Sequence, residues 1–273
     1  MEPTSNKWIR TALDFVTRIY RYSMDYPPEI IMALLEHDTT LRTITDGILA
    51  SAASCGHMEI AKLLLGRRAP GSDTKTISVA LRNACRQSRV NMANLFLQHG
   101  ATFAEADENS SGRSCLYLAI DTNAPNCLEM VTLILDNGAD AYGEPSKLVS
   151  ALWRACDTAK GYTKLVELLL ARGADVNATG NSGLTLLLSC CHKGRIDIFK
   201  LLLANGADPN LAFDNGMTPL MLAALYNKYN RIGPLLEAGA DVTAVDDEGK
   251  SVLDYLEGKA DMLELCWRYV EKN

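Results

Sequence analysis

The chain of 273 residues carries 27 basic and 33 acidic side chains, a net charge of −6, and 48% of its residues are apolar. This balance is ordinary for a folded globular protein and excludes wholesale disorder, a collagen-like chain and a small disulfide scaffold. The excess of acid argues against non-specific nucleic-acid binding, which needs a basic face. Residues 1–99 are net basic and residues 100–273 net acidic. Either a solvated surface or an acidic face that attracts a basic partner explains this asymmetry.

The first 43 residues predict a degenerate pair of helices. An apolar stripe at helical spacing starts at Trp8 and ends at Tyr20. Pro27-Pro28 marks a turn, and residues 29–36 form the second predicted helix. We interpret this segment as a cap at the N-terminal end of a larger array.

One pattern repeats along the rest of the chain: an apolar, mostly leucine triplet followed a few residues later by Gly-Ala-Asp. Its period is 33 to 35 residues, which indicates a stack of small structural units. The Gly-Ala-Asp copies begin at Gly138, Gly173, Gly206 and Gly239, and an imperfect copy begins at Gly100.

Residues 183–208 show the order of elements within one unit. An apolar segment from Thr185 to Cys191 predicts a first helix, and Gly194 interrupts it. Residues 196–203 predict a second helix, which Gly206 ends because glycine tolerates a positive φ. Neither helix can bury its apolar stripe alone, so neighbouring units must stack.

This unit resembles the ankyrin repeat. Residues 215–224 (NGMTPLMLAA) are similar to the start of that repeat, residues 54–65 (SCGHMEIAKLLL) to its middle and residues 173–178 (GADVNA) to its end. The resemblance covers nearly the whole chain, about residues 17–262. Two units also resemble degenerate repeats of fungal signalling proteins.

The resemblance implies an all-α solenoid of about seven to eight helix-turn-helix units in a single domain, residues 1–273. Residues 1–43 are then the N-terminal cap unit, residues 44–245 the central repeats and residues 246–273 the C-terminal cap. Caps at both ends predict a freestanding solenoid.

Three departures from the ankyrin pattern stand out. No unit keeps the histidine that follows Thr-Pro-Leu in the family, so large or apolar side chains must replace it. Cysteines take the place of small packing residues at four positions, which predicts buried, unreactive thiols. Gly233-Pro234 falls where the seventh unit needs a helix, which predicts that this helix starts late or kinks.

By resemblance, we expect a protein-interaction module or adaptor that binds a partner in its concave groove. In the family, partners contact the loop tips and the exposed side of each first helix. Aromatic and arginine side chains dominate binding hot spots. The candidate partner-binding residues are Trp153, Phe213, Met217, Leu225, Tyr226, Arg86 and Arg154. Trp153 has an alternative role, because it can instead fill the space of the missing histidine.

A second hypothesis is a small-molecule site, or an unusual enzyme of the cyclisation or isomerisation type, on the same concave face. Its candidate catalytic residues are Asp121, Asp157 and His192, a polar row in which an acid and a base could act together. A solvated charged surface is the alternative interpretation of this row. Assembly of identical copies is a third possibility.

The remaining expectations concern surroundings and ligands. No apolar run reaches the length of a membrane span, and the polar N-terminus does not look like a signal peptide. We therefore expect a monomer in the cytoplasm or nucleus, where eight cysteines stay reduced. No metal, cofactor, nucleic-acid or membrane partner is expected, since the cysteines lack the spacing of a zinc site.

Overall fold

The computed structural model describes residues 45–68, 74–104, 114–121, 124–138, 145–157, 163–180, 183–193 and 195–270. Within these ranges the chain is helical and forms no strand beyond two isolated β-bridges. This confirms the predicted all-α class. None of these helices is both long and apolar enough to cross a membrane. The predicted N-terminal cap, residues 1–43, lies outside the described residues.

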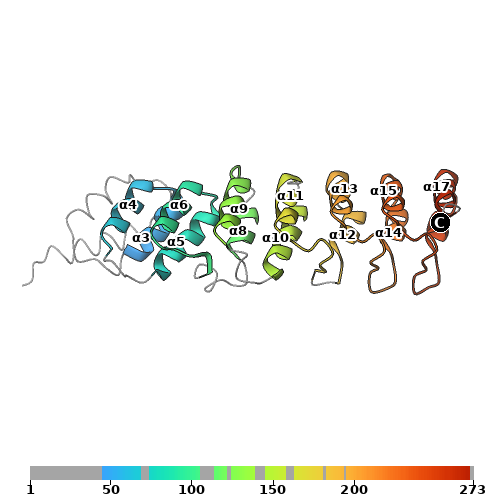
Figure 1. Ribbon diagram of the computed structural model, residues 1–273, viewed down its shortest axis with the longest axis horizontal. Helices are drawn as coiled ribbons and strands as arrows, with labels where there is room; N and C mark the ends of the chain where they lie inside the picture. The colour runs from blue at the N-terminus through green and yellow to red at the C-terminus, as the bar shows by residue number, and fades with distance from the viewer. Residues whose placement is uncertain are drawn as a thin grey trace, which may run out of the picture. The chain divides into compact units, whose positions relative to one another are not determined.

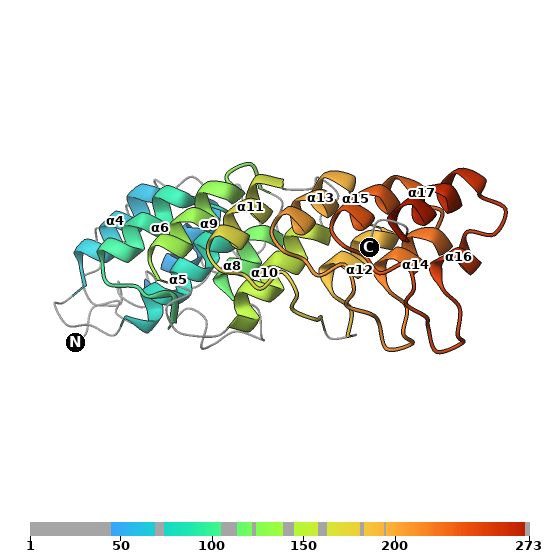
Figure 2. The ribbon, with the colours of Figure 1, turned by 45° about the vertical axis from the view of Figure 1, so that its right-hand side comes forward.

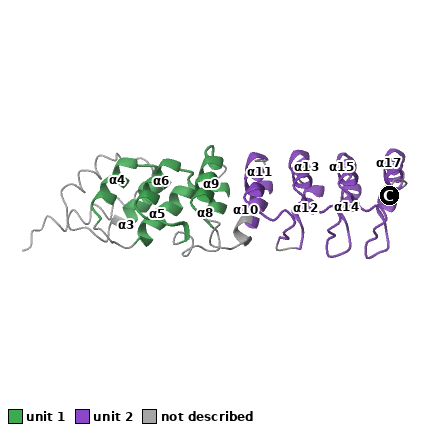
Figure 3. Cartoon of the chain, in the orientation of Figure 1, with its two compact units in different colours: residues 1–143 green, residues 144–273 purple. Residues whose placement is uncertain are grey.

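The chain divides by its internal contacts into two compact units, Met1–Gly143 (unit 1) and Glu144–Asn273 (unit 2) (Figure 3). The described helix pairs of unit 1 are α3 (Thr45–Cys55) with α4 (Met58–Gly66), α5 (Lys75–Arg86) with α6 (Val90–Gln98), and α8 (Cys115–Asp121) with α9 (Cys127–Asp136). Those of unit 2 are α10 (Pro145–Asp157) with α11 (Thr163–Ala171), α12 (Leu186–His192) with α13 (Ile196–Ala204), α14 (Pro219–Leu225) with α15 (Ile232–Glu237), and α16 (Val252–Tyr255) with α17 (Ala260–Val270).

Within each unit the helices form two rows (Figure 1). The first helices of the pairs lie side by side in one row, α3, α5 and α8 in unit 1 and α10, α12, α14 and α16 in unit 2. The second helices form the other row. In unit 2, long loops extend beyond the row of first helices (Figure 2). This is the arrangement that stacking of the repeated pattern predicts.

Small residues let the two rows approach closely. Ala223 and Ala224 in α14 are buried, as are Cys190 and Cys191 at the equivalent positions of α12. Burial raises the pKa of the Cys190 thiol to about 12 and also raises that of the half-buried Cys156. These thiols are therefore protonated at neutral pH and pack as small apolar side chains, as predicted.

Threonine side chains fix the start of two first helices. Thr185 and Thr218 are the N-caps of α12 and α14, and their hydroxyls accept hydrogen bonds from the backbone N–H groups of Leu188 and Met221. Each bond satisfies one of the free N–H groups at a helix start. The cap positions make the helix starts readable from the sequence, since each threonine precedes an apolar run.

In the seventh repeat the second α-helix starts late, as predicted, so that Pro234 does not interrupt it. A 3₁₀ turn at Tyr229–Arg231 precedes α15, which begins at Ile232. Pro234 therefore falls in the first turn, where a missing N–H breaks no helical hydrogen bond. Arg231 is buried here, and its guanidinium lies 5.7 Å from the centre of the Phe199 ring.

Candidate functional site

Three loops of unit 2 share one backbone hydrogen-bonding pattern, and we call them the fingers: residues 173–185, 206–218 and 239–251. Each finger is closed by two backbone bonds at positions that recur every 33 residues, and each precedes a first helix. The closing bonds run from Gly180 N to Leu184 O and Gly183 N to Gly180 O, from Phe213 N to Met217 O and Gly216 N to Phe213 O, and from Asp246 N to Lys250 O and Gly249 N to Asp246 O.

Asparagines link each finger to the next. The Asn177 side chain accepts a hydrogen bond from Asp208 N at 2.8 Å and donates one to Gly206 O at 3.3 Å. Asn210 repeats this one unit later, accepting from Asp241 N at 2.7 Å and donating to Gly239 O at 3.0 Å. The fingers are therefore held against one another before any partner binds.

The end of α14 exposes two of the apolar candidates, Leu225 and Tyr226. Leu225 is 44% exposed and Tyr226 is 41% exposed, at the end of α14. The exposed His192, which ends α12, stacks on Tyr226 with ring centres 4.0 Å apart. The sequence placed all three on the surface, and the structure brings His192 and Tyr226 together as one aromatic surface, with their ring planes tilted by 31°.

Three other candidates are less accessible. The ring of the half-buried Trp153 lies so close to Gly180 that a Cβ added there would be 3.0 Å from it. This contact supports the alternative in which the indole fills space between two neighbouring repeats of unit 2. Phe213 is half-buried. Met217 is only 7% exposed, so the expectation that it lies outside the core was wrong: the finger closes over it through the backbone bond to Phe213.

The charged candidates end the first helices. Arg86 is exposed at the end of α5, and in α10 the half-buried Arg154 pairs with the exposed Asp157 at 3.7 Å. Among the described residues Asp157 and His192 share no hydrogen bond, and the ring of His192 contacts Tyr226. Asp121, half-buried at the end of α8, belongs to unit 1. The catalytic role of this row stays a prediction.

In the last repeat, Tyr255 occupies the position of the family's histidine and hydrogen-bonds to Asp246. The Tyr255 hydroxyl donates a hydrogen bond to Asp246, whose carboxylate also accepts from the N–H groups of Glu248 and Lys250. The Tyr255 bond is the main cause of the lowered pKa of Asp246. In α12 and α14 the same position holds Leu188 and Met221, both buried. Large or apolar side chains thus replace the histidine, as predicted.

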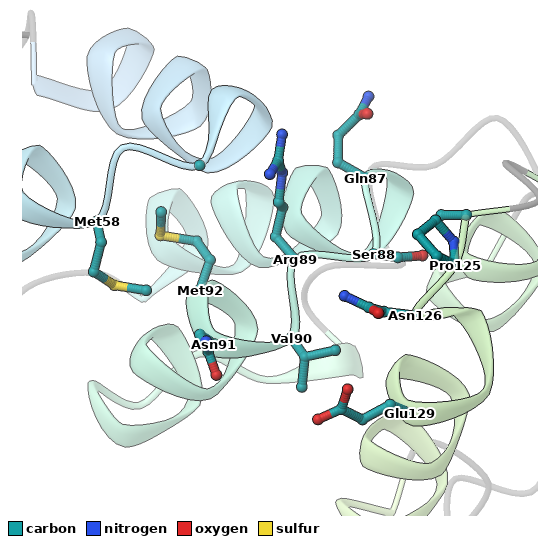
Figure 4. A pocket seen from close by; sticks show the side chains of 12 residues that line it. Met58, Gln87, Ser88, Arg89, Val90, Asn91, Met92, Pro125, Asn126 and Glu129 are labelled. Carbon is teal, nitrogen blue, oxygen red and sulfur yellow. The ribbon is translucent and has the colours of Figure 1, made fainter.

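A polar hollow of about 690 Å³ lies in unit 1, on the side of the turns between first and second helices. It is formed by the turn before α6, the turn before α9 and the start of α4. Asn126 and Glu129 reach into it from the α9 side toward Val90 (Figure 4). Its place differs from the concave face on which the small-molecule hypothesis puts its site.

Sequence reasoning missed two exposed aliphatic residues on the fingers, Leu211 at 38% and Val245 at 58% exposure. Their neighbours along the chain carry the repeat signature, and only the finger geometry shows that their side chains face solvent. It also missed the bridging role of Asn177 and Asn210, although their 33-residue spacing was a readable signal. Within the described residues, His, Cys, Asp and Glu side chains form no group of three that could hold a metal ion.

Comparisons with known proteins agree with this geometry. A family model for ankyrin repeats, in three copies, matches residues 49–143 and 152–246, well over half of the chain. A relative, an ankyrin repeat and KH domain-containing protein of Caenorhabditis briggsae, is 33% identical over 151 residues, or 55% of this chain. The match spans only 6% of that much longer relative.

Proposed function

This chain belongs to the ankyrin-repeat family, and from that premise we propose that it is an adaptor that holds a partner protein in the concave groove between its first helices and its fingers. Ankyrin repeats generally mediate protein–protein interaction. The observation that supports this groove is the aromatic surface of His192 and Tyr226 beside the exposed Leu225. Tyrosine is one of the residues enriched at binding hot spots, and the exposed Leu225 adds apolar area beside it.

Several features favour Leu225 and Tyr226 as the centre of this site. They stand on a short, well-packed helix whose other residues, from Pro219 to Ala224, are all buried. A partner would therefore meet a surface whose conformation is already fixed, which lowers the entropy cost of binding.

The test is quantitative capture from a cell lysate by the full chain and two variants. Leu225→Ser with Tyr226→Ala removes the apolar surface, whereas Trp267→Ser removes a 51% exposed apolar residue of α17 as a matched control. We expect a protein that the wild type and the control retain and the Leu225/Tyr226 variant loses. That protein, purified, must bind the wild type directly with the same dependence. Equal retention by all three chains would contradict the proposal.

One observation favours a second candidate, a small-molecule site in the hollow of unit 1. Arg89 and Glu129 bring opposite charges to its wall, together with the amide of Asn126, which suits a small polar or zwitterionic ligand. A thermal-shift screen of polar metabolites would test it. A metabolite that stabilises the wild type but not the Asn126→Ala, Glu129→Ala variant supports the site, and the absence of any such metabolite contradicts it.

We further propose that the chain acts as a monomer in the cytoplasm or nucleus. The support is that its described cysteines form no disulfide, and that burial raises the pKa of several of their thiols. Such thiols need neither a disulfide nor an oxidising compartment. Sedimentation equilibrium, together with imaging of the tagged full chain, checks both points, and a stable dimer or an extracellular location would contradict them.

A further inference from the structure

The fingers of unit 2 expose aliphatic side chains beside acidic ones. Leu211 is 38% exposed and Val245 is 58% exposed. Among the large apolar residues that the structure describes, Val245 is the most exposed. The two residues do not occupy equivalent positions, because Ala244 is the counterpart of Leu211 and Ala212 that of Val245. They lie on successive fingers, and each offers apolar area from which a partner can exclude water.

The charge around these aliphatic residues has one sign. The three fingers together contain seven carboxylates and a single cation, Lys250. That cation is already engaged, because its ammonium lies 2.7 Å from the carboxylate of Glu248 in the same finger. Asp246 is buried, whereas Asp214 and Asp247 are exposed at the outer ends of the fingers. Those two carboxylates present negative charge to an approaching segment, and complementary charge sets which partners can dock.

Two of the carboxylates recur at equivalent finger tips. Asp214 and Asp247 are 33 residues apart and both exposed. Each carboxylate lies against a glycine of the preceding finger: a Cβ added to Gly183 would be 3.2 Å from Asp214 Oδ1, and one added to Gly216 would be 3.0 Å from Asp247 Oδ1. Because a glycine has no side chain, each tip carboxylate can lie against the preceding finger. The two carboxylates therefore recur at the spacing of the repeats.

The fingers are also held in place before binding. The backbone N–H of Asp247 donates to Asn215 O of the preceding finger at 3.2 Å, and Asn177 and Asn210 bridge successive fingers at their bases. An edge that is already ordered loses little entropy when it binds an extended segment.

Building on the adaptor function proposed above, we propose that the finger edge of unit 2 docks a positively charged, extended segment of the partner in which a lysine or arginine and an aliphatic residue each recur at every third position. Packed helices lie about 8–10 Å apart, and three residues of a polyproline-II segment span about 9 Å. A cation at every third position therefore meets the tip carboxylates of successive fingers, while aliphatic side chains between them cover Leu211 and Val245.

The test is a titration of the full, isotope-labelled chain with synthetic peptides, followed by NMR amide shifts. The probe is a ten-residue peptide in which lysine and leucine each recur every third residue between glycines. Two further peptides replace its lysines by glutamate or its leucines by serine. We expect the lysine–leucine peptide to shift amides in residues 211–216 and 244–249, the serine version to bind more weakly and the glutamate version not to bind.

Two isosteric variants with equal charge change separate this edge from general attraction. Asp214→Asn with Asp247→Asn removes the tip carboxylates, and Glu237→Gln with Asp261→Asn removes two exposed carboxylates elsewhere in unit 2. We expect the first to raise the Kd of the lysine–leucine peptide about fivefold and the second to leave it nearly unchanged.

Equal weakening by both variants, equal binding of the glutamate peptide, or amide shifts located elsewhere would each overturn the inference. If the peptide fails in this way while lysate capture still depends on Leu225 and Tyr226, the adaptor function stands and only the partner's chemistry is wrong. If the peptide binds the fingers but no protein is captured through Leu225 and Tyr226, the present inference stands and the groove proposal fails.

Discussion

At the scale of single residues, Gly216 has little room for a side chain. Its φ is +75°, and a Cβ there would be 3.1 Å from the backbone Cα of Asp246 in the next finger. Gly206 has a similar φ of +84° but nothing within 4 Å of such a Cβ. An alanine at either position would therefore have to adopt a left-handed backbone, and at Gly216 its Cβ would also clash with the next finger.

We predict that Gly206→Ala lowers the free energy of unfolding by about 1 kcal/mol, the cost of forcing alanine into the left-handed region. Gly216→Ala is predicted to lower it by about 2–3 kcal/mol, because the backbone of the next finger must also move. Urea denaturation of both variants beside the wild type measures the difference. Equal losses would show that finger stacking leaves room at Gly216.

Ser88 and Asn227 are the two non-glycine residues with positive φ in the described chain, at +48° and +56°. They occupy equivalent turns between first and second helices, where α3 and α4 are joined by Gly56. Ser88 is only 3% exposed, and its hydroxyl has no hydrogen-bond partner among the described residues. Asn227 is exposed, and asparagine tolerates this conformation well.

We predict that Ser88→Gly raises the free energy of unfolding by about 1 kcal/mol, because it removes both backbone strain and a buried, unsatisfied hydroxyl. Asn227→Gly relieves less backbone strain and removes no buried hydroxyl, so it should change the free energy of unfolding by less than about 0.5 kcal/mol. The midpoints of urea unfolding compare the two. A stabilisation shared equally by both variants, or a loss at Ser88, would contradict this account.

At the scale of elements, the side chain of Asn210 connects two fingers with two hydrogen bonds, to Asp241 N and Gly239 O. Each such bond contributes about 0.5–1.5 kcal/mol, so Asn210→Ala should cost about 1–2 kcal/mol. Asn205→Ala is the control, because its exposed amide bonds only to Leu201 O of its own helix. Faster hydrogen exchange at the Asp241 amide in the first variant alone would locate the loss. An equal cost in both variants would refute the bridging role.

The elements differ in how far the sequence predicts them. Helix starts at Thr185 and Thr218 and the late start of α15 follow from local chemistry, because capping and proline geometry act within one turn. The burial of Met217 and the contact of His192 with Tyr226 depend on how one unit lies against the next. Such packing brings together residues from different repeats, so the sequence pattern of a single repeat does not predict it.

At the scale of the whole molecule, the candidate site shows the same limit. The sequence placed candidates at the ends of first helices by the repeat, and Leu225 and Tyr226 are exposed there. Trp153, equally aromatic, lies against Gly180 because that finger has no side chain at the position where a later finger has Asp246. A residue of the next repeat, Gly180, therefore decides that Trp153 packs inside the repeat stack instead of facing a partner.

Whether units 1 and 2 unfold together is a question for the whole chain. Each helix pair buries its apolar stripe only against its neighbours, so the stability of a stack is the sum of weak units and strong interfaces. We predict that the repeats form one domain, in which damage to unit 2 also destabilises unit 1. Gly216→Ala should then lower the protection of core amides in α5 by nearly as much as in α14, as measured by native-state hydrogen exchange.

The reciprocal variant separates this coupling from a local effect. Gly100→Ala acts in unit 1, where φ is +87° and the nearest side chain, Thr74, leaves 3.7 Å. In one cooperative domain its cost should appear at the amides of α14 as well as those of α5, because the fully unfolded chain is then the species from which both helices exchange. If each variant changes protection only within its own unit, the two units fold as independent domains and the single-domain prediction is wrong.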